Sequence, residues 1–403
     1  MTATSLGLIG AALVLAGVFL NPRLLRSQRW QAVVTPLASI IGSGFLVVGP
    51  ILAAAAGTQA WLAMTGLCGL GYLFGAAIRH NIQHVEPLLA SQPPVITALL
   101  ERVSDVVLAF AYFISVAYYI NLFAAFGLRL TGVNDVFWIR SIATGVLGGI
   151  GILGLCGGLD ALERLALGAV GLKLSLIGAV LVVLAATTAS DLTQGGVTWP
   201  VLDHPRGYRE LSVLLGLIVL VQGFETSRYL GEAYDWKTRV TTMRQAQWIS
   251  TAIYIVFIVL ITRYFTDTPP QNGEETVIID MLRPLGLVVG PMIILAALAS
   301  QLSAAVADTN GAGGLLSESL GKRLSSNVGH LITALAAISI VWVANIYEII
   351  TYASKAFVAY YALQSIQAAR SAWLQRNFVR TLLFVLATAL ALVVIVFAIP
   401  ADA

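Results

Sequence analysis

The sequence predicts an all-α integral membrane protein with about twelve transmembrane helices, from its composition and from the length of its apolar runs. Hydrophobic residues make up 58% of the 403 residues, charged residues only 11%, and the mean hydropathy is +0.87. A soluble domain carries roughly 25% charged residues, so this chain lacks the side chains for a water-facing surface. Apolar runs of about 20 residues cross a bilayer as helices, because a helix satisfies its own backbone hydrogen bonds.

Candidate membrane spans are the apolar runs, each of which needs about 20 residues. They lie near residues 4–20, 32–56, 58–79, 98–127, 138–157, 163–188, 210–231, 246–265, 284–316, 328–345, 347–367 and 381–399. Two of them, 98–127 and 284–316, are longer than a bilayer requires. We expect these two helices to be tilted or to continue beyond the membrane surface.

The basic residues are distributed unequally between alternate loops, which predicts the orientation of the chain in the membrane. If the segment 21–31 with Arg23, Arg26 and Arg29 faces the cytoplasm, 14 basic residues lie inside and 6 lie outside. The opposite orientation would reverse this excess. We therefore expect a multi-pass protein of a bacterial-type inner (cell) membrane, with both termini on the exterior side.

The longest exterior linker, residues 189–208, separates two halves that can each hold five helices. It contains Pro200, Pro205 and the pair Gly195–Gly196, which interrupt regular structure. The predicted organisation is an extra N-terminal transmembrane helix with a basic cytoplasmic loop at 1–30, a first five-helix repeat at 31–188, the exterior linker at 189–208, a second five-helix repeat at 209–368 and a C-terminal transmembrane helix at 369–403.

The span 32–56 contains Gly42 and Gly44 on either side of Ser43, near its centre. Each glycine weakens a helix by about 1 kcal/mol relative to alanine and lets the backbone leave helical geometry. We therefore expect an interruption of this helix at mid-depth. The alternative interpretation is close packing between helices through small residues.

A second interruption is predicted in the span 210–231, where Gly223 lies between Gln222 and Glu225. Each interruption falls in the first helix of a predicted repeat, and corresponding broken helices point to a transporter binding site. Freed N–H groups at such breaks bind an anion such as a carboxylate, and freed carbonyl groups hold a cation. The predicted substrate-binding residues are Ile41, Gly42, Ser43, Gly44, Tyr118, Tyr119, Gln222, Gly223, Phe224, Glu225 and Thr226. The alternatives are ordinary packing for the two tyrosines and capping of freed N–H groups for Glu225.

At these residues the chain resembles the amino acid–polyamine–organocation (APC) superfamily of transporters, which has the LeuT-type fold. Ile40–Phe45 (IIGSGF) is similar to the superfamily's Ile-Gly-Ser-Gly-Ile-Phe signature in core helix 1, and Gly223–Glu225 (GFE) is similar to its Gly-Phe-Asp/Glu in core helix 6. Glu232 matches the first glutamate that follows in the superfamily. The resemblance covers about residues 30–370, and it departs from the superfamily's pattern in core helix 8 at 308–311.

This resemblance implies a LeuT-type core of two inverted five-helix repeats, with one extra N-terminal and one extra C-terminal helix. It implies a secondary active transporter (permease) for an amino acid or related small amine. Transport would be sodium-independent, proton-coupled or by exchange, and would use alternating access. A transporter of another small solute (organic cation, nucleobase or ion) and a non-transporting membrane solute sensor of the same fold are the alternatives.

Four ionisable residues lie deep in the predicted spans, namely Lys173, Glu225, Asp308 and Lys355. A charge at the bilayer centre costs roughly 3 kcal/mol, so such side chains usually face a cavity or a partner. Lys173 looks like the helix 5 lysine of sodium-independent APC members, whose ammonium occupies the place of sodium in sodium-coupled relatives. Our hypothesis is that Lys173 replaces sodium and carries the coupled proton. Lys355 is interpreted as a partner for Asp308 or Glu225.

Hydroxyl groups of core helix 8 face this lysine in such relatives, which makes Ser300 and Ser303 candidate partners of Lys173. The alternative is that each serine bonds only to the backbone of its own helix. The predicted coupling residues are therefore Lys173, Ser300, Ser303, Asp308 and Lys355.

The sequence contains no motif for covalent chemistry or ATP hydrolysis: GxxxxGK[ST], HExxH and GxSxG are absent. His80 and His84 share a helical face. They are interpreted either as a pair of metal ligands or as solvated or interfacial side chains. Cys68 and Cys156 fall in apolar runs and are expected to be buried, unpaired thiols. We expect no enzyme activity, cofactor, metal or nucleic acid; the expected partners are the small-molecule substrate (amino acid or amine), the proton and the lipid bilayer.

Overall fold

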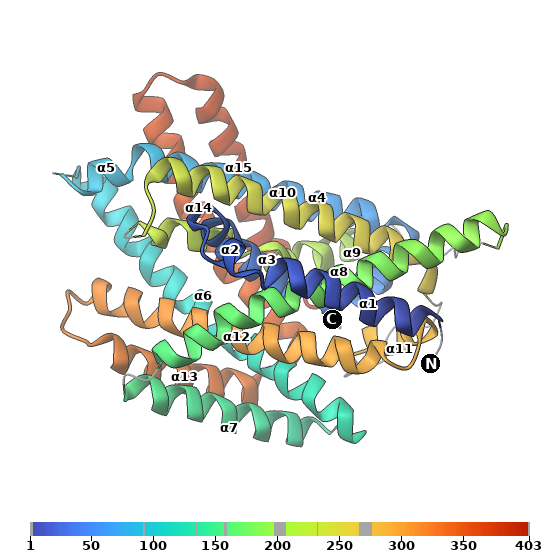
Figure 1. Ribbon diagram of the computed structural model, residues 1–403. Coiled ribbons are helices and arrows are strands. Elements are labelled where there is room, and N and C mark those ends of the chain that lie inside the picture. Colours follow the sequence, from blue (N-terminus) through green and yellow to red (C-terminus); the bar gives the residue numbers. More distant parts are fainter. Residues whose placement is uncertain are drawn as a thin grey trace.

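The computed structural model describes residues 3–91, 93–133, 135–156, 159–196, 207–231, 233–265 and 276–401, and at residues 3, 43 and 159–169 it describes only the backbone. Within these ranges all regular structure is helical (Figure 1). With η for 3₁₀ helices, the elements are α1 (Ala3–Phe19), α2 (Pro22–Leu25), α3 (Gln28–Ala56), η1 (Gly57–Gln59), α4 (Ala60–His84), α5 (Glu86–Leu89), α6 (Val95–Leu128), η2 (Arg129–Thr131), α7 (Val136–Leu155), α8 (Leu159–Thr193), α9 (Tyr208–Leu215), η3 (Ile218–Val221), η4 (Phe224–Leu230), α10 (Trp236–Ile261), η5 (Thr262–Tyr264), α11 (Ile278–Met281), η6 (Arg283–Leu285), α12 (Val289–Ser319), α13 (Ser326–Val343), α14 (Ile346–Leu374) and α15 (Phe378–Phe397).

Each predicted span coincides with a helical segment, so the predicted all-α membrane architecture is confirmed. Eight helical stretches of the described chain are long and apolar enough to cross a membrane, and one of them contains both α3 and α4. The largest difference is the start of α10, which begins at Trp236 rather than near residue 246. The Asp235 carboxylate accepts a hydrogen bond of 2.6 Å from the Thr238 N–H, which caps the helix before its apolar part begins. This bond also holds the pKa of Asp235 below its usual range.

The packing of the helices relates the two halves of the chain. α3 contacts η3 and η4, α4 packs against α10, α6 against α12, and α7 against α13. In each pair the second member is the counterpart of the first in the predicted order of five plus five helices. Because five is odd, counterparts cross in opposite directions, which is the relation between inverted repeats. We therefore propose 31–188 and 209–368 as the two repeats; residues 197–206 of the linker lie outside the described residues.

The two additional helices pack against the outside of this core. α1 lies along α8, and α15 packs against α14 and α4. Figure 1 shows α7 and α13 side by side on one flank of the bundle. Phe378, Val379 and Leu382 of α15 are largely exposed, as expected for a helix that faces lipid.

The predicted interruption of the first core helix is not formed, and this expectation was wrong. α3 runs as one helix from Gln28 to Ala56 through Gly42 and Gly44. A Cβ atom at Gly44 would lie 2.6 Å from the Cβ of Leu220, and one at Gly42 would lie 2.9 Å from the Nζ of Lys173. These glycines therefore allow neighbouring groups to approach α3 closely, which is the alternative that the sequence left open.

The second predicted interruption is present and longer than the sequence suggested. α9 ends at Leu215, and the chain continues as η3 and η4, with Gln222 and Gly223 between them. Gly223 has φ +116°, in the left-handed region that side chains other than glycine rarely enter. A Cβ there would also lie 2.5 Å from the Oγ of Ser39. The break therefore needs a glycine at this position, for its conformation and for its contact with α3.

The two cysteines are free thiols, as predicted. Cys68 is buried, but Cys156 is exposed, which corrects the expectation for that residue. Cys156 lies at the C-terminal cap of α7, where the helix ends.

Candidate functional site

Lys173 of α8 reaches α3 at the place where the sequence predicted the break. The side chain is buried, and its Nζ donates a hydrogen bond of 2.6 Å to the Ala38 carbonyl oxygen. The Oγ of Ser300 in α12 donates a bond of 3.3 Å to the Gly42 carbonyl oxygen. Gly42 thus faces both the ammonium and this hydroxyl. The structure brings Lys173, Gly42 and Ser300 together, from α8, α3 and α12.

Ser303, the second candidate hydroxyl, makes a different contact. Its Oγ donates a hydrogen bond of 2.9 Å to the Ser300 carbonyl oxygen of its own helix. This is the backbone alternative considered for these serines. Ser303 nevertheless lines a cavity next to the Lys173 contact.

This cavity has a volume of about 110 Å³ and lies between α3, α8, η4 and α12. It occupies the half of α3 that starts at Gln28, which we call the Gln28 end; the opposite half is the Ala56 end. Its lining is formed by Val34, Thr35, Ala38, Ser39, Val170, Thr226, Ser303, Ala304, Val306 and Ala307. Thr35 and Ser39 were not predicted. Their spacing of one helical turn in an apolar helix is the signal that could have identified them.

Glu225 is fully buried beside the break, and its two carboxylate oxygens have different surroundings. Oε2 accepts hydrogen bonds from the Gly223 N–H at 2.9 Å and from the Tyr361 hydroxyl at 2.8 Å. Oε1 has no hydrogen-bond partner among the described residues. Glu225 therefore caps an N–H group freed by the break, as its alternative interpretation stated, and keeps one oxygen unused.

The other residues predicted around the break are buried or line the cavity. Nε2 of Gln222 donates a hydrogen bond of 3.0 Å to the hydroxyl of Tyr119, which links the break to α6. The ring of Tyr118 lies 5.3 Å from that of Tyr119. Phe224 stacks on the Tyr361 ring at 5.0 Å, and Thr226 donates to the Gly223 carbonyl oxygen at 2.8 Å. The side chain of Ser43 and all of Glu232 lie outside the described residues.

Asp308 and Lys355 do not form the pair that the sequence suggested. Asp308 is buried in α12 and accepts a hydrogen bond from the Ser115 hydroxyl of α6. Lys355 is half-buried, and none of the ion pairs between described residues includes it, Asp308 or Glu225. The correction has a simple cause: a partly exposed lysine can extend its ammonium toward water and does not need a buried partner.

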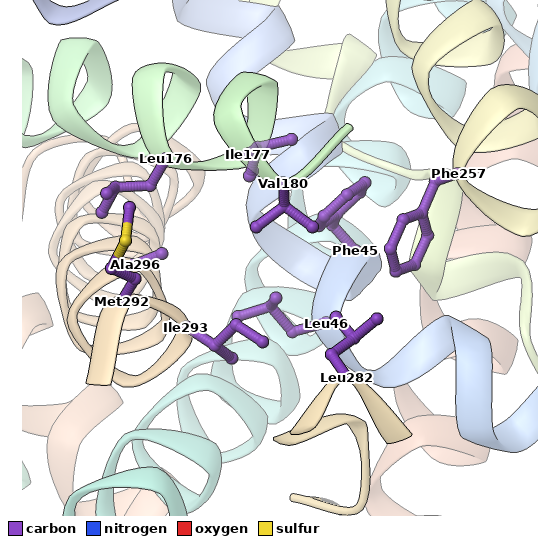
Figure 2. A pocket seen from close by; sticks show the side chains of 10 residues that line it. All are labelled: Phe45, Leu46, Leu176, Ile177, Val180, Phe257, Leu282, Met292, Ile293 and Ala296. Carbon is purple, nitrogen blue, oxygen red and sulfur yellow. The ribbon is translucent and has the colours of Figure 1, made fainter. Parts of the chain in front are cut away.

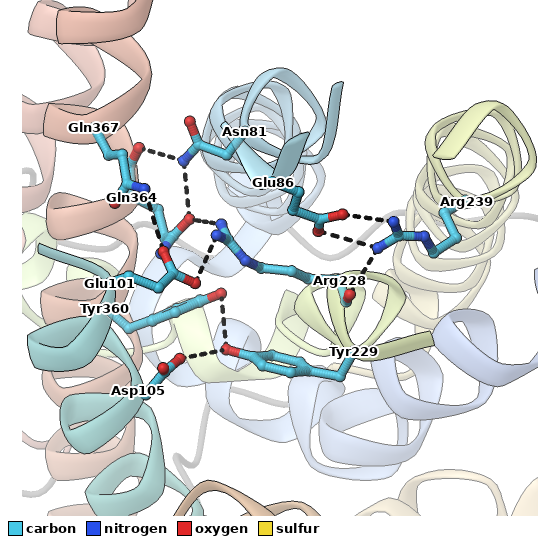
Figure 3. A network of polar contacts seen from close by, with 10 residues as sticks. All are labelled: Asn81, Glu86, Glu101, Asp105, Arg228, Tyr229, Arg239, Tyr360, Gln364 and Gln367. Carbon is cyan, nitrogen blue, oxygen red and sulfur yellow. Dashed lines mark hydrogen bonds and ion pairs between the residues drawn. The ribbon is translucent and has the colours of Figure 1, made fainter. Parts of the chain in front are cut away.

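A polar network that the sequence analysis missed fixes η4 at the Gln28 end (Figure 3). Arg228 pairs with Glu101 of α6 at 2.7 Å and also donates to the Gln364 side chain of α14. Arg239 of α10 donates to the Arg228 carbonyl oxygen at 2.7 Å and pairs with Glu86 at 2.5 Å. The signal was a charged residue three positions after Glu225 in an apolar span. These contacts tie the segment that carries Glu225 to α5, α6, α10 and α14.

The Ala56 end of the site is closed by apolar side chains (Figure 2). A cavity of about 10 Å³ remains there, which is about the space that one water molecule needs. Its lining includes Phe45, Phe257 and Ile293, and the two aromatic rings lie 4.2 Å apart. The residues around Lys173 and Gly42 therefore have a cavity on one side and tight apolar packing on the other.

The chain is similar to several known proteins. Residues 22–398 match the family model described as APC superfamily transporter. An uncharacterized protein of Aquifex aeolicus (strain VF5) is 44% identical over 383 residues, which cover 94% of this chain and 93% of that protein. A solved structure of a nucleobase-cation-symport-1 family transporter, in a closed conformation with bromovinylhydantoin bound, is 15% identical with a TM-score of 0.43, covering 88% of this chain and 78% of the other. With the family match extending over nearly its whole length, the chain belongs to the APC superfamily of transporters.

Proposed function

We propose that this protein carries an amino acid or a related small amine by sodium-independent alternating access, coupled to protons or by exchange. It would act in a bacterial-type inner membrane with both termini outside. The main support is the Lys173 ammonium, which is bonded to the Ala38 carbonyl oxygen at 2.6 Å beside Gly42 and Ser300. The adjoining cavity on one side and the apolar closure on the other are what one state of an alternating-access cycle requires.

Lys173 is suited to couple a proton to this cycle. An ammonium on a helix carbonyl supplies the positive charge that a bound sodium ion would supply. Loss of its proton would remove that charge and weaken the contact between α8 and α3, because hydrogen bonds from charged donors are the stronger ones. The contact joins two elements that line the cavity, so its strength bears on the shape of the cavity.

The test is uptake into proteoliposomes, with labelled amino acids and amines, with and without an inward proton gradient. The Lys173→Met variant keeps the volume of the side chain and removes its charge. We expect it to lose the stimulation by the gradient, with uptake lower by about tenfold, or 1.4 kcal/mol. Lys355→Met is the matched control, since Lys355 is half-buried and in none of the described ion pairs. A Lys173→Met protein with the wild-type pH dependence would contradict the proposal, and binding without uptake under any gradient would indicate a sensor.

A further inference from the structure

Two adjacent cavities lie between the first turns of α3 and α10, apart from the candidate solute site. Their volumes are about 450 Å³ and about 510 Å³. Arg29 lines both of them, so the two cavities meet at this side chain. Neither shares a lining residue with the cavity beside the Lys173 contact. Together they form a separate space along the contact between α3 and α10, which we call the α3–α10 groove.

The first cavity of the groove is polar and has an excess of positive charge. Arg29 of α3 and Lys237 of α10 are exposed, and none of the ion pairs between described residues includes either. The Nζ of Lys237 lies 5.5 Å from the centre of the Trp236 ring, a contact that keeps the charge of the ammonium. Asp235 offsets one of the two charges, and its carboxylate is bonded to the Thr238 N–H at 2.6 Å.

The second cavity of the groove is lined mainly by apolar side chains, among them two tryptophans. The Trp30 ring of α3 stacks on Phe19 at 5.9 Å, and the Trp248 ring of α10 lies 5.4 Å from that of Tyr72. Phe19 and Tyr72 are outside the lining, so each tryptophan is held from behind by an aromatic neighbour. Tryptophan rings are enriched where a membrane meets water, which is the boundary that the groove crosses.

The two cavities follow one another along α10 in the order expected for a membrane surface. The polar cavity is lined by the first turns of this helix, and the apolar cavity begins near residue 246, where its apolar run begins. A helix rises about 18 Å from Lys237 to Ile249. This is close to the roughly 15 Å of hydrocarbon in one leaflet. A cationic space at the membrane surface thus continues into an apolar space within it.

We infer that the α3–α10 groove binds an anionic phospholipid. Its phosphate accepts hydrogen bonds from Arg29 and Lys237, and an acyl chain lies in the apolar cavity between the two tryptophans. Basic side chains at a membrane surface attract anionic lipids. A zwitterionic phospholipid fits less well, because its ammonium would lie beside two cations. A free anion would leave the apolar cavity unfilled. The inference does not depend on which solute the protein carries.

The first test compares two phospholipids with the same acyl chains, dioleoyl-phosphatidylglycerol and dioleoyl-phosphatidylcholine. Each is added in increasing mole fraction to the purified, delipidated full chain in detergent, and thermal unfolding is measured. We expect phosphatidylglycerol to reach its half-maximal shift at about a tenfold lower mole fraction. Equal mole fractions for the two lipids overturn the inference. Glycerol 3-phosphate should give no shift, and a shift equal to that of phosphatidylglycerol would indicate a site for a small anion instead.

The second test removes the two cations of the groove. In the double variant Arg29→Gln, Lys237→Gln, we expect the half-maximal mole fraction of phosphatidylglycerol to rise about tenfold, to that of phosphatidylcholine. The matched control is Lys322→Gln, Arg323→Gln, which makes the same change in net charge at exposed residues between α12 and α13. The control should keep the wild-type preference. Equal loss in both double variants would show a general attraction between charges and overturn the inference.

A measurement on the wild type decides if the groove variant does not fold. The protein is incubated with an equimolar mixture of the two phospholipids and analysed intact by mass spectrometry. Retention of phosphatidylglycerol in preference to phosphatidylcholine supports the inference. Equal retention of both, or retention of neither, overturns it.

Discussion

At individual glycines of this protein, the missing Cβ atom makes room for a close contact with a neighbouring element. At Gly44, a Cβ would lie 2.6 Å from the Cβ and 2.7 Å from the Cα of Leu220, which cannot move without moving the η3 backbone. Gly44→Ala should therefore destabilise the fold by about 1–3 kcal/mol through overpacking. Thermal unfolding in detergent measures this. Gly66→Ala is the control, because nothing lies within 4 Å of a Cβ there and α4 gains helix propensity. Equal unfolding temperatures for the two variants would show that Gly44 does not carry a close contact.

The same residues mark the limit of what the sequence could predict about the site. Gly42 and Gly44 fit an interrupted helix or a close packing surface equally well when only local sequence is considered. Their role depends on Lys173 and Leu220, which are more than 120 residues away along the chain and approach through tertiary packing. Gly223 was easier to predict, because Gln222 and Glu225 beside it place polar groups in an apolar span. Glycine alone is ambiguous, whereas glycine beside buried polar residues indicates a break.

Among the elements, η4 depends most on a polar contact. Arg228 is almost fully buried and Glu101 is 17% exposed at its side chain, so removing the arginine leaves a poorly solvated carboxylate without its cation. Arg228→Met should cost about 3 kcal/mol of stability, the lower part of the range for a broken buried pair. It should also increase hydrogen exchange in η4. Arg263→Met breaks the more exposed pair with Asp191 and should cost about 1 kcal/mol or less. If both variants lose the same stability, the network does not hold η4.

Helix ends and contacts between helices were predicted with unequal success, for a physical reason. Hydrocarbon requires long apolar helices, so the apolar runs identified every span. The first turns of α10 are polar and extend beyond the apolar run, and their capping by Asp235 is visible only in the structure. The Arg228 network joins side chains from α4, α5, α6, η4, α10 and α14 (Figure 3). No local pattern indicates which of these polar side chains will meet.

Across the whole molecule, the two ends of the candidate site differ, as the proposed alternating access requires. The cavity between α3, α8, η4 and α12 lies at the Gln28 end, next to the basic segment with Arg23, Arg26 and Arg29. The Ala56 end is filled by apolar side chains (Figure 2). If the basic segment faces the cytoplasm, as the distribution of charge predicts, this structure corresponds to a state whose cavity is on the cytoplasmic side.

Cysteine accessibility tests the conformation and the orientation together. In a background with Cys68→Ala and Cys156→Ser, Thr35→Cys places a thiol in the cavity and Ile293→Cys places one in the closed apolar region. A membrane-impermeant maleimide should label Thr35→Cys in inside-out vesicles and not in right-side-out vesicles, because the cavity is on the predicted cytoplasmic side. The native Ile293 is 1% exposed. We therefore expect Ile293→Cys to stay unlabelled from either side until the protein changes state.

Labelling in both vesicle orientations separates an error in the predicted orientation of the chain from an error in the position of the cavity. Labelling of Thr35→Cys only from the exterior would leave the cavity in place and reverse the predicted orientation of the chain. Labelling of Ile293→Cys from the side opposite to Thr35→Cys, increased by a bound solute, would give direct evidence that the closed end opens. Because α8 and α12 line both regions, opening at one end by their movement relative to α3 should reduce labelling at the other. Simultaneous labelling of both positions in one state would instead describe a continuous pore, which alternating access forbids.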